Sequence, residues 1–125
     1  MSGNRYVLDT NAIVSLLQGN ELLIQLLQEA DWIGISIISQ IEFLVFPDLT
    51  ESDRQLFQEF LQRVQVIDLT TENEALIREI IKVRQQYRLK LPDAVIAAMA
   101  VDRSASLITA DQEFKKVSVL TVISW

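Results

Sequence analysis

Four acidic residues stand out because each lies where an expected strand gives way to a turn or a helix: Asp9, Glu42, Asp93 and Asp111. The chain has no histidine and no cysteine. Hydrolytic chemistry would therefore use carboxylates, hydroxyls, lysine or a metal held by oxygen, and not an imidazole base, a thiolate or a soft zinc site. Hard oxygen ligands favour Mg2+ or Mn2+.

Each of these acids also has a simpler explanation at the start of a helix. Asp9 and Asp111 could cap the helices that follow them. Glu42 closes a capping-box pattern that begins at Ser39, and the same pattern recurs over residues 71–74. Asp93 lies in the first helical turn, where the helix dipole stabilises any carboxylate. Each signal is therefore weak by itself.

Taken together, the four positions indicate a site, because parallel strands end at one edge of a sheet and ligands bind at that edge. Carboxylates about 5 Å apart, at an effective dielectric of about 20, repel each other by roughly 3 kcal/mol per pair. Such a cluster must bind divalent cations, take up protons or find arginine partners. A hard divalent cation suits these ligands best.

Short apolar runs alternate with amphipathic segments along the whole chain. We expect strands at residues 5–9, 32–36, 64–69, 106–109 and 119–123, and helices at 10–18, 21–30, 39–46, 51–63, 71–87 and 94–102, with a single helical turn at 111–115. This alternation predicts one α/β domain over residues 1–125, with helices on both faces of a mostly parallel sheet.

Two of the amphipathic helices have apolar stripes that predict which side chains face the core. The residues expected to point inward are, in the helix over 51–63, Leu56, Phe57, Phe60 and Leu61, and, in the helix over 71–87, Ala75, Leu76, Ile80 and Ile81.

The composition limits the kind of protein. Half of the 125 residues are apolar, which is enough for one buried core. No apolar run is long enough to span a bilayer, and the absence of cysteine suggests a reducing cytoplasm. We therefore expect a cytoplasmic protein with no membrane partner.

The formal net charge of −6 would ordinarily argue against a nucleic-acid partner. Five of the eleven basic residues nevertheless fall within residues 78–90. That stretch is either a solvated helix face paired with Glu74 and Glu79 or a surface for phosphates.

Four segments of the chain resemble the PIN domain, the nuclease domain of the VapC toxins of bacterial toxin–antitoxin pairs. They are residues 7–11 (Val-Leu-Asp-Thr-Asn), 36–44 with Ser39 and Glu42, 91–98 (Leu-Pro-Asp-Ala-Val-Ile-Ala-Ala), and 107–111 (Leu-Ile-Thr-Ala-Asp) followed by Phe114. The order and the local context of all four segments agree, over the full length of the chain.

This resemblance implies a PIN-like three-layer sandwich whose five strands have the order 3-2-1-4-5. It also implies an acidic pocket that holds Mg2+ or Mn2+, with Asp9, Glu42, Asp93 and Asp111 bound to the metal directly or through water. Asn11 and Thr109 would be the polar groups beside the first and fourth acids. Glu113 is close enough in sequence to replace or assist Asp111.

The function implied is a metal-dependent endoribonuclease that cuts single-stranded or looped RNA as the toxin of a toxin–antitoxin pair. One or two metal ions would lower the pKa of a bound water, and an acid of the cluster would help remove its proton. We expect phosphate contacts from Arg84, Arg88 and Lys90. The resemblance also implies an antitoxin partner that blocks the pocket, and a homodimer.

Two other functions remain open at this stage. The chain could be a catalytically silent PIN-like module that pairs with a protein partner, which its acidic balance favours. It could also be a phosphatase or phosphoacceptor domain with Asp9 as nucleophile. That third hypothesis has little support, because no second aspartate follows two residues after Asp9.

Overall fold

The computed structural model describes residues 3–125, and its centre is a five-stranded sheet in which every pair of neighbouring strands is parallel. The strand order is β3-β2-β1-β4-β5, as the resemblance to the PIN domain implied. The strands are β1 (Arg5–Leu8), β2 (Trp32–Ser36), β3 (Gln65–Ile67), β4 (Ser106–Ile108) and β5 (Val122–Ile123).

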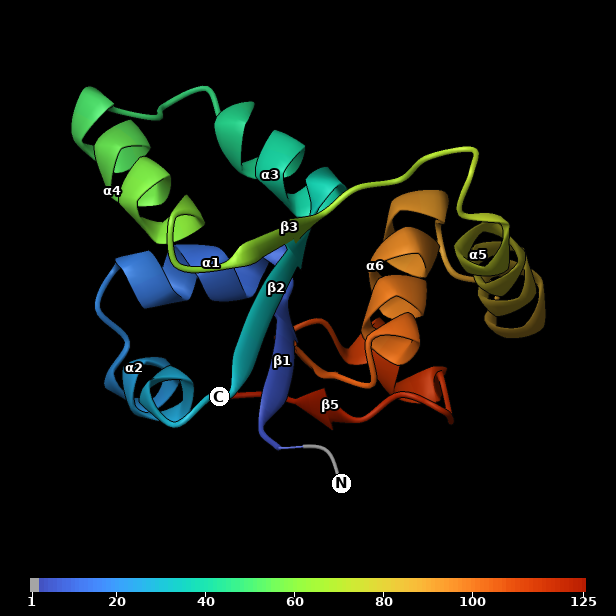
Figure 1. Ribbon diagram of the computed structural model, residues 1–125. Helices are drawn as coiled ribbons and strands as arrows, with labels where there is room; N and C mark the ends of the chain where they lie inside the picture. Colours follow the sequence, from blue (N-terminus) through green and yellow to red (C-terminus); the bar gives the residue numbers. More distant parts are fainter. Residues whose placement is uncertain (1–2) are drawn as a thin grey trace.

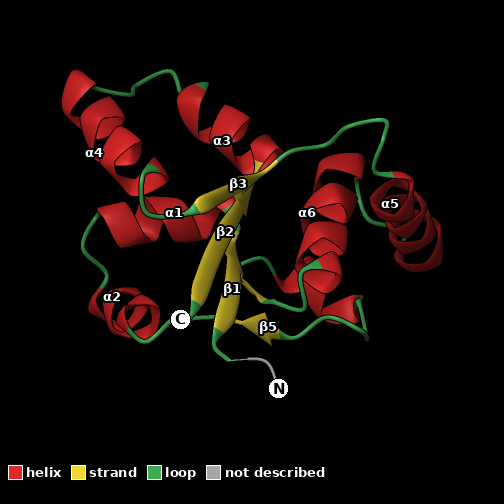
Figure 2. Cartoon of the chain, viewed as in Figure 1, coloured by secondary structure: helices red, strands yellow, loops and turns green. Residues whose placement is uncertain are grey.

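Helices cover both faces of this sheet (Figures 1 and 2). One side carries α1 (Thr10–Leu17), α2 (Glu21–Gln28) and α4 (Glu51–Leu61), and the other carries α5 (Glu74–Tyr87), α6 (Leu91–Asp102) and the short 3-10 helix η1 (Gln112–Lys116). The remaining helix, α3 (Ile37–Leu44), leaves the carboxyl end of β2 directly and contacts both α1 and α6. The result is the three-layer α/β sandwich that the sequence predicted.

Each face of the sheet has its own hydrophobic core. Successive residues of a strand point to opposite faces, so Val7 packs with α5 and α6 while Leu8 packs with α1 and α4. Both side chains are wholly buried, as parallel sheets covered on both faces require. This double burial fixes the end of β1, and with it the position of Asp9.

Helix α6 is apolar on all sides. Residues 94–100 are all buried, and four of these seven are alanines, which lets the helix lie close to the sheet and to α5. Pro92 stands at the start of the helix, where its missing N–H costs no hydrogen bond. Asp93 is therefore held in the first turn of a helix that cannot shift easily.

Two predicted helix caps are wrong. Ser36, not Ser39, caps α3, because its hydroxyl accepts a hydrogen bond from the Ile38 N–H at 3.0 Å. Asn73, not Thr71, caps α5, where its side-chain oxygen accepts from the Leu76 N–H at 3.2 Å. The turn at residues 70–73 displaces the start of α5, so the predicted capping box over residues 71–74 does not form.

The predicted inward faces are partly wrong. Phe57 and Phe60 are buried, but Leu56 is 42% exposed; on α5, Ile81 is 50% exposed, Ala75 is also exposed, and Val83 joins Leu76 and Ile80 in the core. Spacings of three and four residues alternate along each buried face, so the stripes are narrower than predicted. Strand β5 is also shorter than predicted, since a turn occupies residues 118–120.

No helix within residues 3–125 has the length and apolar character needed to cross a membrane.

Candidate functional site

The carboxyl ends of β1 and β4 place the first and fourth acids beside each other. Leu8 is in register with Ile108, and the Asp9 N–H donates to the Ile108 carbonyl at 3.0 Å. Asp9 follows β1 directly and caps α1. Asp111 follows β4 after two residues and caps η1, where its Oδ1 accepts from the Glu113 N–H at 2.9 Å.

Asp9 is almost completely buried, with 7% of its surface exposed, and both of its carboxylate oxygens are held. Oδ1 accepts from the Thr10 N–H at 2.8 Å. Oδ2 accepts from the Thr109 hydroxyl at 2.8 Å and from the Asn11 side-chain amide at 3.2 Å. The capping role considered for Asp9 is therefore real, but it uses only one of the two oxygens.

Asn11 and Thr109 connect the start of α1 to the loop after β4. The Asn11 side-chain oxygen accepts from the Ala110 N–H at 3.0 Å, and the Thr109 hydroxyl accepts from the Asp111 N–H at 3.0 Å. The Asn11 amide also lies 3.3 Å from the Thr109 hydroxyl. Both predicted neighbours of the acids thus touch Asp9 directly and fix its orientation.

Glu42 reaches the same edge from α3. Its Oε1 accepts a hydrogen bond of 2.6 Å from the Thr10 hydroxyl, so the side chain is not used to cap its own helix. Thr10 is buried, and its sequence context did not lead us to predict a part in the site. Its position directly after the strand-end Asp9 is the signal that could have indicated one.

The rise in the pKa of Asp9 reflects its burial first and its acidic neighbours second. Burial raises this pKa most, and the charges of Glu42 and Asp111 raise it further. The hydrogen bonds from Thr109 and Thr10 act in the opposite direction, because they stabilise the ionised form. The net effect is a pKa above the ordinary value.

The pKa of Asp93 is also raised, first by burial and then by the charges of Asp9, Asp111 and Glu42. Lys90 is the one group that opposes this rise. Asp9 and Asp93 therefore each lie within electrostatic reach of Glu42 and Asp111, at one end of the sheet.

Glu113 behaves differently from the four acids. Its carboxylate accepts from the Lys116 ammonium at 2.8 Å, and this ion pair, with a smaller contribution from Lys90, lowers its pKa. Glu113 is exposed and engaged with lysine, so it does not share the uncompensated charge of Asp9 and Asp93.

The donor set fits a hard divalent cation in its chemistry. Its members are carboxylates, and for Asp9 and Asp93 burial and the neighbouring acids disfavour the charged form, which a cation would compensate. Within residues 3–125, however, no three acidic side chains lie close enough in their present rotamers to hold a metal. Binding would therefore require side-chain rotation. Asp93 is suited to this, since no hydrogen bond contributes to its pKa.

Ser39 contributes a buried polar atom on the same helix as Glu42. It is wholly buried, and its hydroxyl has no hydrogen-bond partner among residues 3–125. It lies three residues before Glu42, so the two side chains share one side of α3. The predicted capping box between them is absent.

The three basic residues predicted to contact phosphate have different surroundings. The Arg84 guanidinium donates to the Leu89 carbonyl and so closes the turn between α5 and α6. Arg88 ends α5 in the left-handed conformation, with φ of 56°, and Lys90 stands at the start of α6. Arg88 and Lys90 are exposed beside the first turn of α6.

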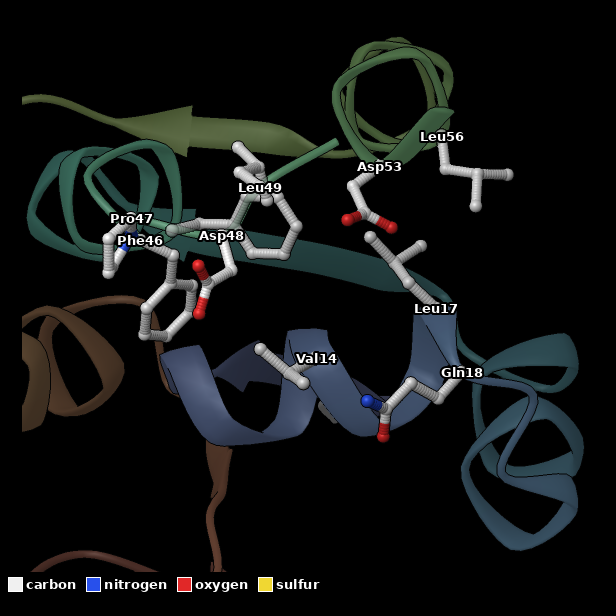
Figure 3. Close-up of a pocket in the computed structure, with 10 residues that line it drawn as sticks. Val14, Leu17, Gln18, Phe46, Pro47, Asp48, Leu49, Asp53 and Leu56 are labelled. Atoms are coloured by element: carbon white, nitrogen blue, oxygen red, sulfur yellow. The ribbon is translucent and has the colours of Figure 1, made fainter. Parts of the chain in front are cut away.

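Two apolar hollows lie elsewhere, between α1 and its neighbours. One of about 260 Å³ lies between α1, the segment after α3 and the start of α4 (Figure 3). Another of about 440 Å³ lies between α1, α2 and α4, and both are lined by Leu17 and Leu56. None of the four acids lines either hollow.

Comparison with known families and structures agrees with this geometry. A model of the PIN domain matches residues 6–120. VapBC2 from Rickettsia felis bound to a DNA fragment from its promoter has a similar fold, with a TM-score of 0.78 and 23% identity over 97% of this chain and 98% of that chain. A toxin–antitoxin complex from Klebsiella pneumoniae gives a TM-score of 0.76 and 27% identity over 94% and 95% of the two chains.

VapBC-1 from nontypeable Haemophilus influenzae gives a TM-score of 0.77 and 21% identity over 97% and 98% of the two chains. A comparison with curated proteins gave no match.

Proposed function

Since this chain belongs to the PIN domain family, we propose that it is a divalent-metal-dependent endoribonuclease and the toxin of a toxin–antitoxin pair, acting on RNA in the cytoplasm. The observation that carries the proposal is the set of acids at the carboxyl edge of the sheet, Asp9, Glu42, Asp93 and Asp111. The charges of the other acids contribute to the pKa values of Asp9 and Asp93, although the four residues are spread over positions 9 to 111 of the chain. The structures of toxin–antitoxin complexes with a similar fold support the biological role.

We propose that these four acids hold Mg2+ or Mn2+. When bound, such an ion lowers the pKa of a bound water and compensates negative charge on the phosphate. The protein's own contribution is orientation: Thr109 and Asn11 fix Asp9, and Thr10 fixes Glu42.

We assign proton removal from the attacking water to the Asp93 carboxylate. A general base needs a carboxylate oxygen that is free to accept the proton, and no hydrogen bond from the protein contributes to the pKa of Asp93. Asp9 is less suited to this step, because both of its oxygens already accept hydrogen bonds from the protein.

The test is cleavage of a single-stranded RNA oligonucleotide by the purified protein with Mn2+ or Mg2+, with and without chelator. Asp9→Asn should abolish cleavage while the circular dichroism spectrum stays unchanged. Asp68→Asn is the matched control, since Asp68 is exposed after β3. This variant should cleave the RNA as the parent does. Equal cleavage by Asp9→Asn, or cleavage that survives chelation, would refute the site.

A catalytically silent module is the second candidate, and one observation favours it. No three acids are assembled to hold a metal within the described residues. Titration with Mn2+ followed by calorimetry separates the two functions, because the nuclease requires saturable binding that Asp93→Asn removes.

We further propose that an antitoxin segment occupies the two apolar hollows beside α1. Asp48 and Asp53 line the smaller hollow, so the part of the segment that enters it should carry basic residues among its apolar ones. The larger hollow is lined by one acid and one base, Glu59 and Arg63. Leu56→Glu places a charge on the wall that both hollows share and should abolish complex formation with the product of an adjacent reading frame. Retained binding would exclude this surface.

Self-association is proposed from exposed apolar side chains on α3. Val45 directly follows that helix and is 68% exposed, and Ile41 lies one turn before it. A homodimer through this face predicts twice the chain's mass in light scattering and a monomer for Val45→Lys. A monomeric parent protein would exclude it.

A further inference from the structure

Charge is divided unequally along the chain. Residues 1–73 contain 11 acidic and three basic residues, whereas residues 74–125 contain six acidic and eight basic residues. The acidic part supplies helices α1 to α4, and the other part supplies α5, α6 and η1. Because α1, α2 and α4 lie on one side of the sheet and α5 and α6 on the other (Figure 1), this division also separates the two faces of the molecule.

Four exposed basic side chains gather where the second part borders the acidic site. We name them the basic rim: Arg88, Lys90, Lys115 and Lys116. Arg88 and Lys90 lie in the turn before α6, and the two other lysines end η1. A hydrogen bond of 2.9 Å between the Tyr87 and Ser118 hydroxyls joins the end of α5 to the segment after η1, so these pieces are neighbours.

Lys90 links the basic rim to the acids. It is the N-cap of α6, and Asp93 lies in the first turn of that helix. Helix η1, which ends with Lys115 and Lys116, begins directly after Asp111. Each half of the basic rim therefore belongs to an element whose start carries one of the four acids. The basic rim borders the same end of the sheet at which the four acids meet.

The basic rim is largely free of acidic partners. The ion pairs within residues 3–125 are Lys116 with Glu113 and Arg103 with Asp102. Arg88, Lys90 and Lys115 are thus available to a ligand. A solvated helix face, the alternative for basic residues, would show acidic partners at the neighbouring helical positions.

We propose that single-stranded RNA reaches the acidic site across the basic rim, with its phosphates on Arg88, Lys90, Lys115 and Lys116, and that the α1–α4 face repels it. This inference rests on the proposed ribonuclease function and adds the path of the substrate. It adds two η1 lysines to the predicted phosphate contacts, and it sets Arg84 aside because its guanidinium closes the α5–α6 turn. Phosphate contacts of this kind position a strand without reading its sequence.

Binding of a fluorescent single-stranded RNA oligonucleotide, measured by anisotropy in an Asp93→Asn background over a range of salt concentrations, tests the path. The parent should bind with a salt-dependent Kd. Lys115→Glu combined with Lys116→Glu should weaken binding about tenfold at low salt and reduce the salt slope by roughly 0.7 for each lost contact. The matched control, Arg54→Glu combined with Arg63→Glu on the acidic side, should bind as the parent does.

Glu113→Gln provides a test of opposite sign. It releases Lys116 from its ion pair, so RNA binding should tighten, by about twofold to threefold at low salt. The proposal is overturned if both double variants weaken binding equally, if the basic-rim variant binds as the parent does, or if the parent does not bind RNA at low salt. Binding is measured in the Asp93→Asn variant, which does not need to cleave RNA. The binding result can therefore be judged even if the nuclease assay of the parent protein fails.

Discussion

Helix α3 and the start of α4 carry the same sequence pattern, a hydroxyl residue followed three positions later by an acid, and use it in opposite ways. At α4 the Thr50 hydroxyl accepts from the Asp53 N–H at 3.1 Å and the Asp53 carboxylate accepts from the Thr50 N–H at 3.0 Å. In α3 the Ser39 hydroxyl has no partner, and Glu42 turns away to Thr10. One carboxylate serves its own helix, and the other is diverted to the acidic site.

The pKa values of the acids repeat this contrast. Hydrogen bonds from Thr50 lower the pKa of the exposed Asp53, so its ionised form is favoured in the folded state. Burial and neighbouring acids raise the pKa of Asp9 and Asp93, so their ionised forms are disfavoured. The pKa shift of the helix-capping Asp53 is thus opposite in sign to the pKa shifts of the site acids Asp9 and Asp93.

The largest expected effect comes from neutralising a site acid. Asp93→Asn should reduce RNA cleavage and Mn2+ affinity by more than about a hundredfold, which exceeds the loss typical for residues that only support a ligand. The same change should raise the melting temperature of the metal-free protein near neutral pH, because it removes repulsion among the acids. If Asp93→Asn is less stable than the parent and binds Mn2+ with unchanged affinity, Asp93 has a structural role, as Asp53 does.

Thr10 should show a smaller effect on the same site. Thr10→Val keeps the shape but removes the donor to Glu42, and we expect Mn2+ affinity to fall about tenfold to a hundredfold. Thr10→Ser retains the hydroxyl and should restore most of that affinity. If valine and serine variants bind Mn2+ equally, Thr10 does not orient Glu42.

The pH dependence of stability separates the two kinds of acid. Folded Asp9 and Asp93 retain their protons to higher pH than they do in the unfolded chain, so they stabilise the metal-free fold progressively as pH falls from neutral through their raised pKa values. Asp53 acts with the opposite sign, since its contribution is lost as pH falls through its lowered pKa. The melting temperature of metal-free Asp9→Asn should therefore exceed that of the parent by several degrees at about pH 7.5, and by less at about pH 5.

Added Mn2+ should reverse this pH dependence of the parent's stability, because Mn2+ binds the ionised carboxylates. Its stabilising effect on the parent should weaken as pH falls. A melting temperature that is independent of pH for both parent and variant would contradict the assignment of raised pKa values to the site.

The capping box of α4 should behave as a purely structural feature. Thr50→Ala removes one of its two hydrogen bonds and should lower the free energy of unfolding by about 1 kcal/mol. Cleavage and Mn2+ affinity should not change, because Thr50 lies at the start of α4 and touches none of the four acids. A change in Mn2+ affinity would show that the two patterns are coupled.

Periodicity and chain order were sufficient to predict the alternation of strands and helices and a mostly parallel sheet, whereas the strand order followed only from the resemblance to the PIN domain. They failed where two residues compete for one role. Ser36 and Ser39 are both plausible caps, and the choice between them depends on where β2 ends in the folded sheet. The exposure of Leu56 likewise depends on the hollows beside α1, which no pattern along α4 reveals.

For the site, strand ends identified the four acids, because chemistry at a sheet edge follows from topology. The bond from Thr10 to Glu42 escaped prediction, since these residues are 32 positions apart and belong to different helices. The engagement of Glu113 with Lys116 was also missed, although both lie in η1. An i, i+3 pair of opposite charge is a common surface feature, and it gave no reason to prefer one partner for Glu113 over another.

Ser39→Ala should have the smallest effect and the most informative sign. A buried hydroxyl without a partner costs about 1 to 3 kcal/mol relative to one that is bonded, and alanine is a better helix former than serine. Removing the hydroxyl should therefore raise the free energy of unfolding by up to about 1 kcal/mol, as measured by urea denaturation. Ser52→Ala, at an exposed position of α4, is the matched control that reports helix propensity alone. If Ser39→Ala destabilises the protein while Ser52→Ala does not, the hydroxyl has a partner in solution. The Ser39 hydroxyl in α3 would then be hydrogen-bonded, as the Thr50 hydroxyl is in the capping box of α4.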